Sequence, residues 1–551
     1  MVWTSFPLHC TRPPGSQIAA RPMRSMRAAR GRGRSMPFNS VGFLFVLLPV
    51  SLAFYHLLFA RSDRFRQLFL ILVTLLFYAV GGAEYLGLLI ASVAVNYLAA
   101  RLIAGGTPGS RRARAALAGG IGFNLALLFY FKYMNFFIGN ANALFGTDLV
   151  LRTVVLPLGI SFFTFQQIGF LVDLSRGRFT LGRAVDYASF VLFFPQLLSG
   201  PIVKYDELTP QLQTRPARWT ASANILIGLT IFAIGLAKKT VIADSIGGLG
   251  APVFEAAAAG QSAGMAVSWI AAFAYTAQIY FDFSGYSDMA IGVARMFGIV
   301  LPFNFHSPLR ATSIIELWRR WHVTLSRWVQ TYIFQPLSMP LARFAAHRMP
   351  GRLGMFVMSF AVPTTLAMVV IGIWHGAGWT FVLFGALQGL YIIVNEYWRQ
   401  ARRKKRKASN SVPPAYAAPL ARALTLVAFV VAQVLFRSPD LATAGLLYTN
   451  MIGMGPAGGA ALLTAWPGGL AGALVALLAV YAVVYLAPNT QQFMARWTPV
   501  LEWEKWRKVD PPARPIEWKM TAAWVAASAL ILFVGFVLMM RGTTNFIYFN
   551  F

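Results

Sequence analysis

Nine stretches of the chain are apolar over about the 20 residues that a helix needs to cross the hydrocarbon core of a bilayer. Lipid is the solvent that suits them, because 57% of the 551 residues are hydrophobic and only 12% are charged. With several shorter apolar runs, they predict an all-α polytopic membrane protein of roughly 11 transmembrane helices plus re-entrant or short helices. The stretches lie near residues 43–60, 84–103, 116–139, 221–242, 355–374, 379–396, 418–436, 468–487 and 521–540.

The formal net charge of +30 invites a comparison with nucleic-acid-binding proteins. The basic residues, however, are gathered in short segments between the apolar stretches, at 61–66, 111–114 and 402–407. Cytoplasmic loops of inner-membrane proteins carry such an excess of Lys and Arg. We therefore expect no nucleic-acid partner, a multi-pass protein of the bacterial inner (cytoplasmic) membrane in contact with lipid, and an extracytoplasmic C-terminus.

Residues 1–35 differ from the rest of the chain, with seven Arg, no acidic residue and no apolar run. We interpret them as a disordered basic arm or an over-extended start, and residues 36–551 as a single membrane domain without internal repeats. The single cysteine, Cys10, lies in this arm. The membrane domain therefore has neither a structural disulfide nor a cysteine nucleophile.

Two histidines stand in or against apolar segments, and the first is His322 in the sequence WRRWHVTLS. Apolar residues recur at helical spacing around it and predict a helix over 316–334, with His322 on one face with Arg319 and Ser326. A partly desolvated imidazole stays neutral and can take a proton from a hydroxyl or thiol. A histidine that only bonds a backbone carbonyl is the equally weighted alternative, although ionisable groups within membranes are commonly functional.

The second histidine, His375, ends an apolar stretch and is followed by Gly376 and Gly378. The glycines predict a helix break that lines a cavity. A histidine that merely caps the helix end is an equal alternative. A metal pair is disfavoured, because His322 and His375 lack the close spacing of helical zinc ligands, and we expect no metal site.

Other polar groups lie in apolar surroundings. Asp282 and Asp288 would be costly without partners, and we expect Arg295, Arg319 or Arg320 or helix N-termini to satisfy them, with a purely structural ion pair favoured for Asp282. Gln166 lies in an apolar helix, where polar packing between helices is the simpler interpretation. The segment 195–204 has the Pro and Gly residues of a re-entrant turn.

Six sequence blocks, in this order, resemble the membrane-bound O-acyltransferase (MBOAT) family, and in particular its bacterial branch typified by the alginate O-acetylation membrane protein. The resemblance covers about residues 36–551. The blocks are LPLGISFFTFQQIGFLVD (156–173), FFPQLLSGPIVKY (193–205), YFDFSGYSDMAIGVARMFG (280–298), PFNF (302–305), ELWRRWHVTLSRW (316–328) and IWHGAGWTFVLFGALQG (373–389).

The resemblance implies an O-acyltransferase of EC 2.3.1 type, with helices arranged around a central tunnel. There a cytoplasmic thioester donor, acetyl-CoA or another acyl thioester, meets an extracytoplasmic polysaccharide acceptor, with no bound cofactor and with a periplasmic SGNH-type acetyltransferase or esterase as partner. His322 matches the catalytic histidine of the family and His375 its second signature histidine. We expect Ser326 to orient His322. The Arg319/Arg320 pair is expected either to hold a donor phosphate or to anchor Asp282 or Glu316. Asp288 and Gln166 complete the candidate substrate-binding residues.

Two further features bear on the substrate. Residues 336–340 read PLSMP where the branch has PLGG, so alginate itself is in doubt as the acceptor. The C-terminal residues 545–551 resemble the tail of the small partner of teichoic-acid D-alanylating members. Tyr548 could therefore relay an acyl group, or serve as an aromatic anchor at the membrane interface.

Other functions remain open at this point. Within the family, the acceptor could be peptidoglycan or a teichoic-type polymer. From another class, a polysaccharide or lipid transporter or flippase would also show broken helices and buried charges. No inverted repeat is evident in the sequence.

Overall fold

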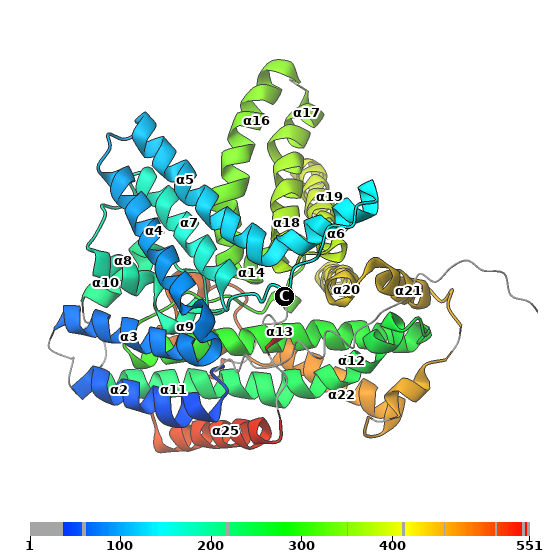
Figure 1. Ribbon diagram of the computed structural model, residues 1–551. Helices are drawn as coiled ribbons and strands as arrows, with labels where there is room; N and C mark the ends of the chain where they lie inside the picture. The colour runs from blue at the N-terminus through cyan, green and yellow to red at the C-terminus, as the bar shows by residue number, and fades with distance from the viewer. Residues whose placement is uncertain are drawn as a thin grey trace, which may run out of the picture.

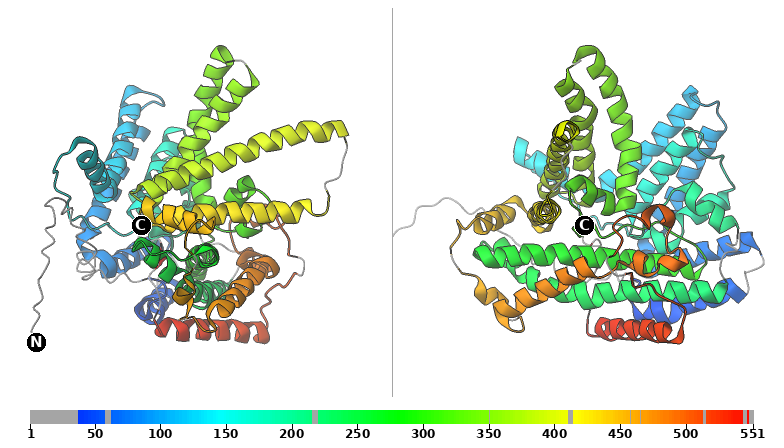
Figure 2. Two further views of the ribbon diagram at one scale, coloured as in Figure 1. Left: turned by 90° about the vertical axis from the view of Figure 1, so that its right-hand side faces the viewer. Right: turned by 180° about the vertical axis from the view of Figure 1, so that it is seen from behind.

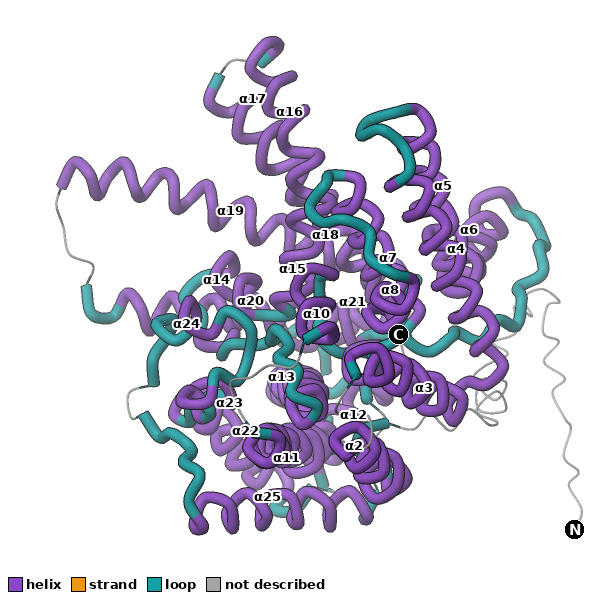
Figure 3. The backbone as a smooth tube through the Cα atoms, turned by 90° about the vertical axis from the view of Figure 1, so that its left-hand side faces the viewer, coloured by secondary structure: helices purple, strands orange, loops and turns teal. Residues whose placement is uncertain are grey.

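The computed structural model describes residues 37–57, 62–214, 220–349, 351–409, 414–456, 458–464, 466–512, 515–542 and 546–547. The regular secondary structure of these residues is all helical: loops connect the helices, and none of the described residues forms a strand (Figure 3). The predicted all-α class is therefore confirmed. The prediction for residues 1–35 falls on a segment outside the described residues.

One layer of the molecule consists of long, nearly parallel helices (Figure 1). α11 (Ala221–Ala237) packs against both α13 (Met265–Met296) and α25 (Ala522–Met540), and α12 (Asp244–Ala258) also packs on α13. Two glycine pairs bring α11 and α13 together. A Cβ on Gly235 would lie 2.6 Å from the carbonyl oxygen of Gly285. Small residues at such crossings let backbones approach closely within a membrane.

A second group of helices is inclined to this layer (Figure 1). It contains α4 (Leu86–Ala104), α5 (Arg111–Leu128), α7 (Ile160–Ser175), α16 (Gln335–Arg348) and α18 (Val362–His375). α18 packs on α19 (Trp379–Ser409), which extends away from the other helices in Figure 2. The site described below is bordered by side chains of α7, α13 and α18.

The other α-helices are shorter or more peripheral. They are α2 (Leu48–Leu57), α3 (Asp63–Gly82), α6 (Met134–Phe145), α8 (Ala184–Val191), α9 (Phe194–Leu197), α10 (Tyr205–Gln213), α14 (Ile314–Arg320), α15 (Val323–Val329), α17 (Arg352–Phe356), α20 (Ala417–Arg437), α21 (Leu441–Met451), α22 (Gly469–Leu486), α23 (Thr490–Phe493) and α24 (Trp503–Trp506). α9 and the irregular chain after it are buried, as expected for a re-entrant segment.

Eight helical segments in the described part of the chain are long and apolar enough to cross a membrane, and Phe43–Leu57 is a shorter apolar helix. One of the eight, Asp63–Ala104, joins α3 to α4, so the sequence analysis missed α3 as a spanning element. α7 and α13 lie outside this criterion, yet both are buried along nearly their whole length. With these two interior helices and the shorter helix Phe43–Leu57, the eight segments come to the roughly 11 that were predicted.

Two of the π-helical turns that interrupt the long helices carry lysines that are buried or half-buried. η3 (Phe129–Tyr133) lies between α5 and α6 and contains Lys132, and η4 (Lys238–Ala243) lies between α11 and α12. A π-turn inserts an extra residue into a helix and is frequent at functional sites. Within a membrane it can also aim a charged side chain at an interior partner.

Candidate functional site

His322 lies at a break between two short helices, α14 and α15. The prediction of one continuous helix over 316–334 is therefore wrong. His322 has φ 42°, in the left-handed region, and the neighbouring backbone groups bond to an extended segment instead of to a helix. Val323 N–H donates to Asn304 O (2.9 Å), and His306 N–H donates to Arg320 O (3.0 Å). The segment 304–306 thus supplies the backbone partners that would otherwise continue the helix.

Asn304 also contacts the imidazole of His322. Its Oδ1 lies 3.3 Å from His322 Nδ1 and accepts a 2.6 Å hydrogen bond from Thr324 Oγ1. Its Nδ2 donates to Ser287 Oγ at 3.0 Å, which fixes the orientation of the amide. Because Oδ1 can only accept, His322 carries its proton on Nδ1 and its lone pair on Nε2. Nε2 has no hydrogen-bond partner among the described residues.

Ser326 does not orient His322, contrary to the prediction. Its hydroxyl donates to Trp321 O at 3.3 Å, because the helix break turns Ser326 away from the imidazole. His322 is fully buried, with the ring of Phe283 edge-on at 4.7 Å. Burial lowers the pKa of His322 to about 3, so the imidazole is neutral at physiological pH.

His375 ends α18, and the predicted helix break after it is confirmed. Gly376 is extended, and a Cβ there would lie 2.1 Å from the ring of Phe381. The indole of Trp374 contacts both histidines, with its ring centroid 6.0 Å from that of His322 and 5.0 Å from that of His375. The structure therefore brings together the two histidines that the sequence singled out.

A pocket of about 520 Å³, partly open to the outside, has His375 on its wall. We call it the His375 pocket. Its wall also includes Lys132, Ser161, Ser199 and Trp374. This composition combines one cation, two hydroxyls and a histidine, which is the kind of polar set that orients a substrate in an otherwise apolar site.

A second, much narrower pocket is lined by Gln166 and by charged and aromatic groups. We call it the Gln166 pocket. Lys204 and Arg327 contribute cations, and Thr324, which bonds to Asn304, also lies on its wall. α7 passes from one pocket to the other, with Ile160–Phe162 in the first and Gln166–Asp173 in the second.

Aromatic side chains separate the two pockets. Trp374, on the wall of the His375 pocket, lies 5.5 Å from Phe165, and Phe165 stacks at 3.9 Å on Trp328, on the wall of the Gln166 pocket. His322 lines neither pocket, although Trp374 and Thr324 link it to both. The pockets therefore approach the histidine pair from two directions.

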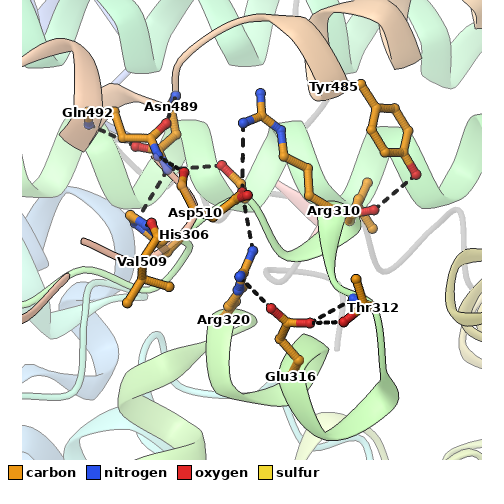
Figure 4. A network of polar contacts seen from close by, with 12 residues as sticks. His306, Arg310, Thr312, Glu316, Arg320, Tyr485, Asn489, Gln492, Val509 and Asp510 are labelled. Carbon is orange, nitrogen blue, oxygen red and sulfur yellow. Dashed lines mark hydrogen bonds and ion pairs between the residues drawn. The ribbon is translucent and has the colours of Figure 1, made fainter. Parts of the chain in front are cut away.

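Two roles were considered for Arg319 and Arg320: holding a donor phosphate, or anchoring Asp282 or Glu316. The structure shows the anchoring of Glu316 by Arg320. Arg320 pairs with Glu316 and, at 3.2 Å, with Asp510, which lies 3.7 Å from Arg310 (Figure 4). Arg319 is exposed. Neither guanidinium lines the described pockets, so this arrangement does not support their holding a donor phosphate.

The carboxylate of Asp510 belongs to a loop that covers the segment 304–306. His306 Nε2 lies 2.8 Å from Val509 O, and Asn489 Nδ2 lies 3.3 Å from His306 Nδ1 (Figure 4). The loop and the backbone of the His322 break are thereby joined by one network of polar contacts.

Asp282 and Asp288 are satisfied by lysines, and not by the arginines that were predicted. Asp282 pairs with Lys239 at 2.6 Å, as the favoured structural ion pair would, and Asp288 pairs with Lys238 at 2.6 Å. Both lysines come from the π-turn η4, which aims them at α13. Asp288 also accepts from Thr490 Oγ1 at 2.6 Å. Asp288 therefore takes part in an ion pair between η4 and α13, and it lines neither of the two described pockets.

Phe546 and Ile547 contact residues of the interior helix α13. Phe546 stacks on Tyr286 at 4.3 Å, and Ile547 N–H donates to Asp282 at 2.9 Å. Tyr548, the predicted relay, lies outside the described residues. The ring of Phe546 also contacts Phe283, which packs on His322, so Phe546 lies near the site.

Sequence analysis missed two residues of the site, Asn304 and Lys132. Asn304 lies within the PFNF block, and its polar side chain between two phenylalanines was a usable signal. Lys132 is the single acidic or basic residue of the apolar stretch 116–139. An isolated lysine in a membrane span is by itself a candidate for function.

Comparisons with known proteins point to one family. Residues 173–436 match the family described as "MBOAT, membrane-bound O-acyltransferase family". A peptidoglycan O-acetyltransferase of Helicobacter pylori is 36% identical over 446 residues, which are 76% of this chain and 80% of that protein. A protein of Pseudomonas aeruginosa named "Probable alginate O-acetylase AlgI" is 35% identical over 76% of this chain and 75% of that protein.

A more distant similarity links the chain to a teichoic acid D-alanyltransferase of Lacticaseibacillus rhamnosus, 26% identical over 52% of this chain and 76% of that protein. The names of these three relatives give acyl transfer as their activity and peptidoglycan, alginate and teichoic acid as their substrates. The long matches at more than a third identity, the buried histidine pair and the apolar spans lead to one conclusion: the chain belongs to the membrane-bound O-acyltransferase family and is a multi-pass membrane O-acyltransferase.

Proposed function

We propose that the protein passes an acetyl group from a cytoplasmic thioester donor to a hydroxyl of an extracytoplasmic polysaccharide. The observation that carries the proposal is the approach of two pockets to the pair His322 and His375 from different stretches of α7. Such an arrangement suits a reaction whose two substrates arrive from opposite sides of a membrane.

The distribution of charge supports this orientation. The chain that follows α7 contains Arg176, Arg178 and Arg183, and the nearby Gln166 pocket contains Lys204 and Arg327. By contrast, residues 146–159, some of which line the His375 pocket, contain one arginine and one aspartate. The positive-inside rule therefore favours a cytoplasmic Gln166 pocket and an extracytoplasmic His375 pocket.

The chemistry follows from the tautomer of His322. Nε2 accepts the proton of the incoming hydroxyl, whose oxygen attacks the thioester carbonyl carbon. A C–O bond forms, the C–S bond breaks, and the departing thiolate takes the proton back from the imidazolium. His375, on the pocket wall, positions the hydroxyl or polarises the carbonyl. Trp374, on the wall of the same pocket, has its ring centroid 6.0 Å from that of His322 and so connects the pocket wall to the base.

The relatives indicate the class of acceptor. Two of them are named for peptidoglycan and alginate, which both contain sugar hydroxyls. The PLSMP sequence at 336–340 departs from the alginate-type pattern, and we propose an extracytoplasmic polysaccharide other than alginate, with acetyl-CoA or another acyl thioester as donor. We further propose a relay as one form of this transfer: the hydroxyl of Tyr548 is then the first acceptor at the site, and a periplasmic SGNH-type transferase moves the acetyl group from Tyr548 to the polysaccharide.

Acetylation and export of the polymer in cells test the proposal together. Loss of the gene should abolish polymer O-acetylation while polymer export continues, and the His322→Ala and His375→Ala proteins should fail to restore acetyl groups. Loss of export with normal acetylation of the exported polymer would favour a transporter.

A separate variant tests the relay. Tyr548→Phe should remove product acetylation, and wild-type levels in that variant would exclude the relay.

A further inference from the structure

Lys132 has a position that the proposed reaction has not used. It lies in the π-turn η3, and its ammonium group reaches the end of α18, about 240 residues away in sequence. Lys132 Nζ donates to the carbonyl oxygens of Trp374 and, at 3.3 Å, His375, and it lies 3.4 Å from Ser161 Oγ. All three contacts are with residues on the wall of the His375 pocket.

The neighbouring residue acts on the same helix end. Tyr133 OH donates to Ile373 O at 3.1 Å. Consecutive residues of a regular α-helix point about 100° apart, so they rarely reach consecutive carbonyls of one partner. The wider π-turn lets Lys132 and Tyr133 do so. Together they cap the carbonyls of 373–375, which lack intrahelical partners because α18 ends at Gly376.

A cap on this helix end does not by itself require a charge. A partly buried ammonium in a membrane span is expensive, and a neutral amide or hydroxyl would satisfy carbonyl oxygens at lower cost. Lys132 nevertheless lines the pocket beside His375, and it lies 5.8 Å from the ring centroid of Trp374. Lys132 is therefore in direct contact with both Trp374 and His375 on the pocket wall.

We propose that Lys132 is a positioning residue for acyl transfer: its ammonium holds Trp374 and His375 in the orientation that the reaction needs. This inference rests on the proposed role of His375 in the reaction. The inference predicts that loss of the ammonium lowers kcat and leaves KM for the acceptor nearly unchanged. The acceptor still enters the pocket, but a misplaced histidine slows the chemical step.

Chemical replacement of the ammonium tests the inference. Cys10 is the single cysteine, so Lys132→Cys in a Cys10→Ser background carries one thiol, at the pocket wall. Treatment of the purified protein with 2-bromoethylamine converts that thiol into a lysine analogue. Acetyl transfer from acetyl-CoA to a small soluble sugar alcohol is then measured at varied acceptor concentration, together with the unfolding temperature in detergent.

We expect kcat of the Lys132→Cys protein to fall by about 100-fold with little change in KM, and aminoethylation to restore most of it. Lys132→Arg should keep more activity than Lys132→Met, because it retains the charge. Arg152→Gln, which removes an exposed cation from the segment leading into the pocket, should leave kcat unchanged. Tyr133→Phe, which removes one bond of the cap and no charge, should cost less than Lys132→Met.

The contrary results are equally definite. A folded Lys132→Met protein with wild-type kcat would overturn the inference, and so would a folded, aminoethylated protein that remains as slow as the untreated one. If Lys132→Cys does not fold, the comparison of Lys132→Arg with Lys132→Met decides. Failure of the wild-type protein to transfer acetyl would count against the proposed function and is thus distinguishable from failure of this inference.

Discussion

The side chain of Asn304 holds His322 in one tautomer, with Oδ1 lying 3.3 Å from Nδ1 of the imidazole. The amide cannot rotate without losing its 3.0 Å bond to Ser287 Oγ. Nε2 is therefore the basic nitrogen, and it faces the side of the ring that has no hydrogen-bond partner among the described residues. A base must present its lone pair in this way before a hydroxyl can use it.

Asn304→Ala is expected to lower kcat for acetyl transfer by about 100-fold while leaving the acceptor KM nearly unchanged, because the imidazole loses its fixed tautomer and orientation. Steady-state kinetics of the purified protein would measure this. Thr324→Ser, which retains the hydroxyl that donates to Asn304 Oδ1, is the matched control and should remain active. An Asn304→Ala protein with full kcat would exclude the orienting role.

Gly372→Ala is expected to displace the end of α18. A Cβ at this position would lie 2.1 Å from the carbonyl oxygen of Phe381, a backbone atom of α19 that cannot move aside cheaply. Overpacking of this kind costs about 1–3 kcal/mol, so both the unfolding temperature and the activity should fall. Gly87→Ala in α4, where a Cβ would meet nothing within 4 Å, should change neither. Equal behaviour of the two variants would contradict the close packing of α18 on α19.

Asp510→Asn is expected to destabilise the protein and slow the reaction, because Arg320 and Arg310 lose a shared carboxylate next to the His322 break. Removing one partner from a buried ionic network costs about 3–5 kcal/mol, and less here because Asp510 is 19% exposed. Glu502→Gln breaks the exposed pair with Lys505 and should cost about 0–1 kcal/mol. Unfolding temperatures in one detergent would compare them, and similar losses for both would argue against the network of Figure 4.

Acid should destabilise the protein through His306. Burial lowers its pKa to about 4 in the folded state, below the value of about 6.5 for an unfolded chain. Between these two pKa values His306 is protonated in the unfolded chain and neutral in the folded protein, so protonation favours unfolding. The stabilisation is complete above pH 6.5 and is lost as the pH falls toward 4. Unfolding temperatures at pH 7.5 and pH 5 should differ less for His306→Gln than for wild type, and an unchanged difference would contradict a neutral His306.

Sequence patterns were sufficient for the features that depend on short-range chemistry. Apolar length predicted the membrane helices, and Gly376 after His375 predicted the helix break and the cavity beside it. The ion pair of Asp282 with Lys239 was predictable only in part. A carboxylate in apolar surroundings needs a partner, but the sequence does not identify which cation that partner is. The π-turn η4, which delivers Lys239, leaves no clear signal in the residues that form it.

The break at His322 was not predictable from periodicity. Residues 316–334 have a helical apolar pattern, yet the backbone turns at His322 because the segment 304–306 offers hydrogen-bond partners from elsewhere in the chain. Tertiary contacts of this kind override local preference. The role of Asn304 depends on the same contacts, so neither feature is visible until the two segments are placed side by side.

Transfer of labelled acetyl across a sealed membrane tests the central claim most directly. The protein is reconstituted in vesicles, the vesicles with the cytoplasmic face outward are selected, and [14C]acetyl-CoA is added outside with a soluble sugar alcohol trapped inside. The account predicts labelled acetyl ester in the lumen with the wild-type protein and none above background with folded His322→Ala or His375→Ala protein. Wild-type rates of luminal ester formation in both variants would contradict it.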